Sequence, residues 1–168
     1  MMLRVLRAPR LRRDETGSMA IETAFVAPIL LVLALGGFEV STMVARHTEL
    51  QSAAAEAAAV VRAVIPETAE DRATVRDIVA VSICGNYEPE VSGNAAVCGE
   101  DNVTSVEVTP LQRCGTAEGY VSADTDCGSE AAYQFIRVDL SDTYAPIWTT
   151  FGVSKGFDYN VSRTVQVG

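Results

Sequence analysis

The residues best suited to chemistry form the run GSMAIE, residues 17–22, between an arginine-rich leader and a long apolar segment. If a protease cuts after Gly17, Ser18 becomes a new N-terminus with a free ammonium group. Glu22 is then the fifth residue, one helical turn away, and its carboxylate can pair with an ammonium on its own chain or on a packed neighbour. Such a partner matters, because a charge at mid-bilayer costs about 3 kcal/mol.

The segment that positions these residues has the length and composition of a membrane span. Residues 19–38 contain Glu22 as their only charge. As a helix this segment is roughly 30 Å long, which matches one bilayer core. Residues 1–17 contain five arginines and two acidic residues, whereas the remainder contains 8 basic and 20 acidic residues. Because positive flanks stay in the cytoplasm, we expect the N-terminus inside and the C-terminus outside.

A secretory signal is the main alternative interpretation of the same segment. The small residues around Gly36 could form a signal-peptidase site, which would release a secreted domain. Against this, the region before the apolar run would be very long and Glu22 would have no role. A twin-arginine address is disfavoured, because Arg12 and Arg13 are followed by Asp14 and Glu15 rather than by apolar residues.

Residues 12–40, RRDETGSMAIETAFVAPILLVLALGGFEV, resemble the opening of the TadE-like pseudopilins. These proteins belong to the tight-adherence (Tad/Flp) branch of type IV pilus systems, which act in cell adhesion. The positions that carry the resemblance are Arg12, Arg13, Gly17, residues 20–22, Ala27 and Pro28. Beyond them the chain is similar to the family in layout only, with a long helix, a spacer and a small β-rich domain.

The resemblance implies a route for the chain. A prepilin peptidase would remove residues 1–17 by cutting between Gly17 and Ser18, where a residue without a side chain lets a protease approach the backbone. Glu22 would mark the helix for extraction or neutralise the Ser18 ammonium of a neighbouring subunit. Pro28 would kink the helix and so set its packing in the assembly. The length of 168 residues favours a minor, priming or tip-associated subunit, and it does not distinguish a TadE-like from a TadF-like role.

The same resemblance implies a set of partners and a location. The partners would be the prepilin peptidase, other pilin and pseudopilin subunits, the Tad inner-membrane assembly machinery and membrane lipid. The protein would be a single-pass protein of the bacterial inner membrane. Its N-terminus would be cytoplasmic, and its C-terminal domain would be periplasmic or part of the pilus.

The four cysteines are all on the side expected to be exported, where an even number favours disulfides. Three pairings are possible. We favour Cys84 with Cys98 and Cys114 with Cys127, because each bond then closes a short Gly-rich loop. Each bond would stabilise the domain by about 3 kcal/mol through loop entropy.

The rest of the pattern predicts an α+β protein. Helical spacing continues to Val64, so a helix over residues 18–65 either packs onto its own domain or a filament or forms a rigid stalk. Residues 66–168 form the expected periplasmic domain. In it we expect a helix over 69–83 capped by Thr68, loops over 84–102 and 112–130, and strands over 103–108, 133–140 and 157–167, the last with a slip in its alternation. Together these predict a small antiparallel, disulfide-bonded sheet of three or four strands against one or two helices.

No pattern in the chain predicts catalysis. The only histidine, His47, follows the apolar run and is typical of a membrane interface. The acidic segment 124–130 lacks a full calcium-loop pattern, and the cysteine spacing does not suit zinc. The acidic composition disfavours binding to nucleic acid. We therefore expect no enzyme activity, no metal and no cofactor. An uncleaved single-pass anchor carrying a periplasmic binding or sensing domain is the alternative function.

Overall fold

The structure is a computed structural model that describes residues 16–100, 103–152 and 155–167, without the side chains of residues 16–18 and 151. Most of the predicted leader, residues 1–17, lies outside this range. The chain divides into two compact units, Met1–Ser41 and Thr42–Gly168. Helix α1 (Thr16–Val64) is 49 residues long and contributes to both units.

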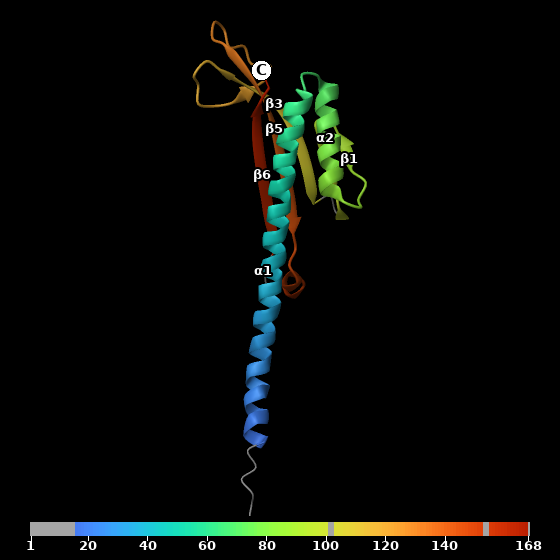
Figure 1. Ribbon diagram of the computed structural model, residues 1–168, viewed down its shortest axis with the longest axis vertical. Helices are drawn as coiled ribbons and strands as arrows, with labels where there is room; N and C mark the ends of the chain where they lie inside the picture. The colour runs from blue at the N-terminus through green and yellow to red at the C-terminus, as the bar shows by residue number, and fades with distance from the viewer. Residues whose placement is uncertain (1–15, 101–102, 153–154, 168) are drawn as a thin grey trace, which may run out of the picture. The chain divides into compact units, whose positions relative to one another are not determined.

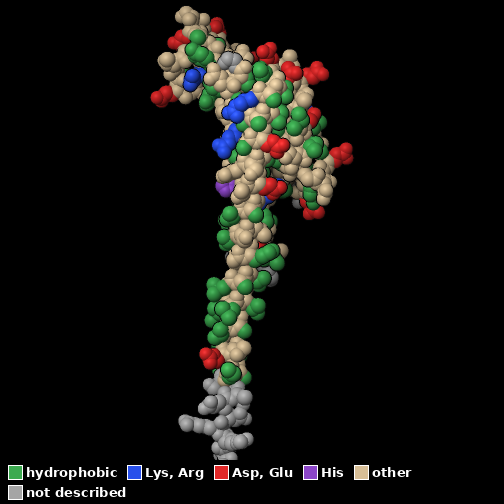
Figure 2. All heavy atoms as spheres, in the orientation of Figure 1, with side chains coloured by type: hydrophobic (Ala, Val, Ile, Leu, Met, Phe, Trp, Pro, Cys, Tyr) green, Lys and Arg blue, Asp and Glu red, His purple; other side chains and the backbone are tan. Residues whose placement is uncertain are grey.

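In the first unit, α1 is an apolar helix with its side chains exposed. The stretch Met19–Val64 contains an 18-residue window with a mean hydropathy of 2.1, and none of that window is buried. Phe25 is 73% exposed and Leu31 is 63% exposed. Figure 2 shows hydrophobic side chains along this part of the helix. By length and composition, the helix can cross a membrane.

In the second unit, one face of α1 is buried and packs onto its own domain. Every third or fourth residue from Leu50 onward is buried, as expected for one face of a helix. The buried residues on this face are Leu50, Ala53, Ala54, Ala57, Ala58 and Val61. Most of them are alanines, and they belong to the same core as the buried residues of α2 and the sheet. Of the roles predicted for this segment, the structure therefore shows packing onto the domain.

Helix α2 (Ala69–Cys84) begins at a capping box, as the sequence predicts. The Thr68 hydroxyl accepts a hydrogen bond from the Asp71 amide at 3.1 Å, and the Asp71 carboxylate accepts one from the Thr68 amide at 3.1 Å. This reciprocal pair satisfies two amides that the first turn leaves without helical partners. The helix ends before Gly85, whose φ of 59° favours glycine.

The β-strands form one antiparallel sheet (Figure 1). Its path runs β1-β2-β3-β5-β6, and β4 pairs with β3 beyond the end of β2. The strands are β1 (Glu90–Ser92), β2 (Ala95–Cys98), β3 (Thr104–Cys114), β4 (Val121–Ser122), β5 (Ala132–Tyr144) and β6 (Phe157–Gln166). A 3-10 helix, η2 (Ile147–Phe151), lies between the last two strands.

The sheet differs from its prediction in two respects. Among the described residues it has six strands rather than three or four, because the expected loops 84–102 and 112–130 contain β1, β2, β4 and the end of β3. These strands are short or carry small and polar residues, so their alternation is weak. Strand β6 pairs with β5 without a slip from Phe157 to Gln166. Arg163 simply occupies an inward-facing register position between Val161 and Val165, and it stays exposed.

One face of the sheet packs under α2 and the second half of α1 to form the core. In β3, β5 and β6 the core residues alternate along each strand, as expected for a half-buried sheet. They are Val106, Val108, Ile136, Val138, Leu140, Val161 and Val165. The opposite face is polar, and its side chains bond across strands, for example Ser105 with Ser141 at 2.7 Å.

Candidate processing and assembly segment

The residues predicted to be processed lie at the start of α1. Gly17 and Ser18 are both helical, in the first turn of the element. Their side chains lie outside the described part of the structure, so the geometry of cleavage there stays a prediction.

Glu22 is exposed on the apolar part of α1. Its carboxylate makes no hydrogen bond or ion pair among the residues that the structure describes. It borders a shallow hollow of about 330 Å³, whose other walls are Met19, Thr23, Val26, Ala27 and Leu30. Glu22 is the only charged residue of these six. An acidic group in such surroundings is available to a cation supplied from outside the described chain.

Pro28 lies inside α1 and is exposed. Because proline has no amide hydrogen, the Ala24 carbonyl loses its helical partner. The helix is nevertheless assigned without a break from Thr16 to Val64. An effect of Pro28 on the packing between helices stays a prediction.

A buried ion pair fixes α1 to the sheet where the second unit begins. The Arg46 Nε donates to the Asp142 carboxylate at 2.6 Å, and the Thr104 hydroxyl donates to its other oxygen at 2.6 Å. The side chain of Asp142 is only 6% exposed. This hydrogen bond to Asp142 is the main reason that the pKa of Arg46 is raised. Through these two hydrogen bonds, Asp142 ties the helix to β5 and β3.

Tyrosines on neighbouring strands extend this polar contact along α1. The hydroxyls of Thr42 and Tyr144 share a hydrogen bond of 2.9 Å, and the Tyr159 hydroxyl donates to the Met43 carbonyl at 3.3 Å. Desolvation raises the pKa of Tyr159. His47 stacks on the Tyr159 ring with the ring centroids 5.8 Å apart. His47 therefore contacts the sheet through its ring, a role that the sequence analysis did not foresee.

The sequence analysis missed this polar contact, although a signal was available. Strand β5 places Ile136, Val138 and Leu140 on its buried face, and Asp142 continues the same alternation. An acidic residue at a core position needs a buried partner. Arg46 lies one helical turn before Leu50, at the start of the buried face of α1.

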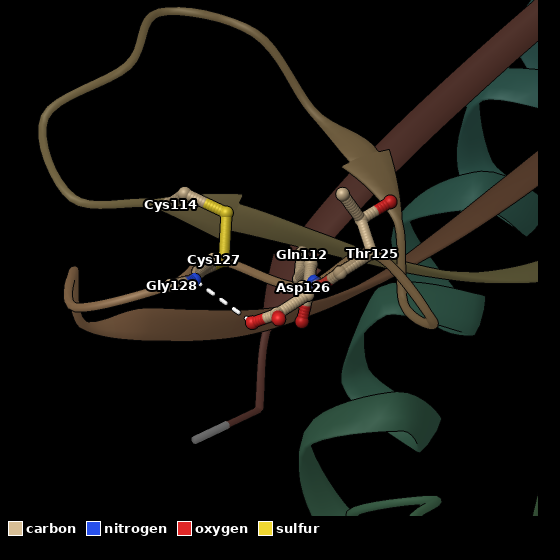
Figure 3. The surroundings of a disulfide bond; sticks show 6 residues. All are labelled: Gln112, Cys114, Thr125, Asp126, Cys127 and Gly128. Carbon is tan, nitrogen blue, oxygen red and sulfur yellow. Dashed lines mark hydrogen bonds between the residues drawn. A yellow bond between two sulfur atoms is a disulfide. The ribbon is translucent and has the colours of Figure 1, made fainter.

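Two disulfides close the loops of the domain. Cys84 of α2 is bonded to Cys98 of β2, and Cys114 at the end of β3 is bonded to Cys127. These are the pairings that the sequence analysis favours. Near the second bond, the Asp126 carboxylate accepts a hydrogen bond from the Gly128 amide at 2.8 Å (Figure 3). In the part of the chain that the structure describes, no group of three or more acidic, His or Cys side chains could hold a metal ion.

The comparison with known protein families finds a match within α1. Residues 17–59 match the model of the TadE-like protein family. The match begins at the predicted cleavage site and includes Ser18, Glu22 and Pro28, which confirms the resemblance in the region where the sequence analysis placed it. No curated protein and no solved structure matches the chain.

The TadE-like match ends within the packed half of α1. It therefore includes the exposed apolar part of the helix and the start of the buried alanine face, but not the sheet. A TadE-like segment implies a role related to the Tad pilus. Together with the apolar helix, it suggests a protein anchored in a membrane.

Proposed function

We propose that this chain is the precursor of a minor pilin or pseudopilin that takes part in assembling a Tad/Flp adhesion pilus. A prepilin peptidase cuts it between Gly17 and Ser18. The chain is then the substrate of an enzyme and has no catalytic activity of its own. The observation that carries the proposal is the exposed apolar helix inside the segment that matches the TadE-like family, with a carboxylate, Glu22, that has no partner among the described residues.

The exposure of the first part of α1 supports a membrane-to-filament route. No part of the chain that the structure describes buries large side chains such as Phe25 and Leu31. Removing a Leu or Phe side chain from water stabilises by about 1.5–3 kcal/mol. The segment is therefore stable in a bilayer or against the helices of other subunits. The basic leader keeps the N-terminus in the cytoplasm, and the domain is periplasmic or part of the pilus.

Glu22 has two roles on this route. In the membrane, an ammonium at Ser18 lowers the cost of holding its charge near the bilayer edge. During assembly, the Ser18 ammonium of a neighbouring subunit replaces that partner. A paired charge in an apolar medium costs much less than an isolated one, so the pairing selects one helical register between subunits.

The N-terminal sequence and intact mass of the membrane-extracted protein test the processing step. A mature start at Ser18 is expected. Gly17→Val should leave the leader attached, because its side chain blocks the approach of the protease to the backbone. Gly37→Val is the matched control, since Gly37 lies in the same helix with no atom within 4 Å of an added Cβ, and it should be cleaved normally.

The alternative function predicts different results in the same experiment. An uncleaved anchor carrying a binding or sensing domain would begin at Met1 whether or not Gly17 is replaced. A start near Val40 would indicate a secretory signal and a released domain. Either result contradicts the proposal.

A further inference from the structure

The loop between β5 and β6 differs in composition from the rest of the domain. Residues 143–157 contain the chain's only tryptophan, Trp148, its only lysine, Lys155, and no acidic residue, although acidic residues outnumber basic ones in the chain by 22 to 13. We call the described residues 145–152 and 155–157 the η2 loop. In it Ile147 is 60% exposed and Phe157 is 45% exposed, Trp148 is partly exposed and Lys155 is exposed. The η2 loop therefore presents apolar side chains and one cation to its surroundings.

The backbone holds the two ends of the η2 loop in place. Pro146 is fully buried, and its carbonyl accepts hydrogen bonds from the Thr149 amide at 2.9 Å and from the Thr149 hydroxyl at 2.7 Å. Gly156 has a φ of 104°, and a Cβ added there would lie 2.9 Å from the Tyr144 carbonyl oxygen, so only glycine fits. Ile147 is thus presented by a defined 3-10 turn that starts at a buried proline.

Hydrogen bonds within the second unit fix the direction of β5 along α1. Asp142 accepts from Arg46, and Tyr144, two residues further along the strand, bonds to Thr42, four residues earlier in the helix. Two strand residues and four helix residues each span roughly 6–7 Å. Strand β5 therefore runs antiparallel to α1 and ends beside Thr42, the residue at which the second unit begins. The η2 loop follows directly after Tyr144.

Thr42 is close in sequence to the end of the apolar segment. It follows Phe38, the last residue of that segment, by four residues of the same unbroken helix, which is roughly 6 Å. The headgroup layer on each side of a bilayer core is about 5–7 Å thick. If residues 19–38 span the core, Thr42 and the start of the η2 loop are therefore at the level of the headgroups.

We propose that the η2 loop is a second membrane-contact site, which docks the domain onto the lipid headgroup layer beside its own membrane helix. Ile147 and Phe157 contact the upper part of the acyl chains. The Trp148 ring lies at the boundary between chains and headgroups, where amphipathic rings concentrate, and Lys155 pairs with a lipid phosphate. A subunit that leaves the membrane must break this contact. The inference rests on the membrane location in the proposed function, but not on cleavage after Gly17.

Trp148 reports its own depth, because it is the only tryptophan. The full chain is reconstituted at one copy per nanodisc of phosphatidylethanolamine and phosphatidylglycerol, with plain lipids or with lipids brominated near the top of the acyl chains. We expect the brominated lipids to remove about half or more of the Trp148 fluorescence. Unchanged fluorescence would overturn the inference. A change that occurs only in discs with two copies would also overturn it, because another subunit would then be the occupant.

Variants separate docking from mere proximity to the bilayer. Ile147→Glu and Lys155→Glu should each reduce the quenching, taken as the ratio of fluorescence in plain and brominated discs, by about twofold or more, because each puts a carboxylate into the contact. Both positions are exposed, so the replacements keep the fold. Val81→Glu is the matched control, since Val81 is an equally exposed apolar residue of α2, at 68%, and it should be quenched like the wild type. Equal loss in Val81→Glu would show a general effect of added charge and overturn the inference.

Maleimide labelling of Leu31→Cys in the same discs distinguishes this inference from the proposed function. Leu31→Cys should be protected while Trp148 is quenched. Protection without quenching would overturn the docking of the η2 loop and leave the membrane helix in place. Labelling of Leu31→Cys would overturn the membrane location and the docking together.

Discussion

The two halves of α1 belong to one helix but differ in the size and the burial of their apolar side chains. Residues 19–38 carry large apolar side chains, and almost all of them are exposed. Between Leu50 and Val61 the helix buries one face against the sheet, and most of the buried residues are alanines. The first half therefore needs an environment that its own chain does not supply, whereas the second half is completed by its own domain.

The comparison shows how residue size distinguishes an internal contact from an external one. The alanines of the second half are buried among core residues of the same chain, where small side chains fit a close-packed interior. Large side chains on all sides suit a lipid bilayer or the helices of other subunits. Arg46 and Asp142 mark the change between the two, because their ion pair fixes the helix to the sheet before the alanine face begins.

Breaking the ion pair should have the largest effect on the second half. Asp142→Ala leaves Arg46 without its buried partner and Thr104 without its acceptor, and it should lower the free energy of unfolding by about 3–5 kcal/mol. Glu49→Ala is the matched control, since Glu49 pairs with the same Arg46 but is 61% exposed, and it should cost at most about 1 kcal/mol. Urea unfolding of the domain measures both. Equal losses would mean that the buried pair does not anchor the helix.

Enlarging a buried alanine tests the packed face directly. Ala57→Leu adds volume to a position with no exposed surface and should destabilise the domain by about 1–3 kcal/mol. Ala59 lies two residues further along the helix, on its exposed face, so Ala59→Leu should change the free energy of unfolding by no more than about 0.5 kcal/mol. Thermal unfolding distinguishes them. If the two variants melt together, the alanine face is not packed as described.

The end of the packed half contains a strained residue whose relief should stabilise the domain. Ile65 has a φ of 50°, a left-handed conformation that a β-branched side chain adopts at a cost of about 1–2 kcal/mol. Ile65→Gly should therefore raise the free energy of unfolding by about 1 kcal/mol, less the entropy that glycine loses on folding. Val64→Gly, within the helix, should lower it instead. A loss of stability in Ile65→Gly would mean that its side chain contributes more than the strain costs.

The stability of the first turn of α2 should depend slightly on pH, because that turn contains the capping residue Asp71. The first turn of α1 contains no acidic residue and should not show this dependence. Hydrogen bonds from Thr68 hold the pKa of Asp71 below its usual value of 3.8. A depressed carboxylate pKa contributes stability that is present above pH 3.8 and is lost as the pH falls through the lowered value. Asp71→Asn should remove this part of the acid dependence. Amide exchange of the first turn of α2 between pH 5 and pH 2.5 measures it, and an unchanged acid profile would contradict the capping role.

Local patterns predicted the elements with strong signals. Thr68, followed by apolar residues at helical spacing, predicted α2. Alternating apolar and polar residues around Val138 predicted β5. The short strands β1, β2 and β4 could not be predicted in this way, because their pairing depends on neighbours far away in sequence. The alternation of β5 marks Asp142 as an inward acidic residue, but it does not identify Arg46, 96 positions away, as its partner.

The residues of the candidate site also divide into those that local sequence predicted and those that only the fold brings together. Glu22, Pro28 and the leader were recognisable because a membrane segment makes a lone charge conspicuous in the sequence, and the family match covers this stretch. The contacts of Thr42 with Tyr144 and of His47 with Tyr159 were not predictable, because only the fold brings this part of α1 beside β5 and β6.

The central claim is that the first half of α1 is covered by a membrane or by other subunits and the second half is not. All four cysteines are in disulfides, so a single added cysteine provides the only free thiol. Leu31→Cys and Ser52→Cys, both at positions exposed in the isolated chain, are treated with a water-soluble maleimide in native membranes and again after detergent. We predict rapid labelling of Ser52→Cys throughout and labelling of Leu31→Cys only after detergent. Equal labelling of both positions in native membranes would contradict the account.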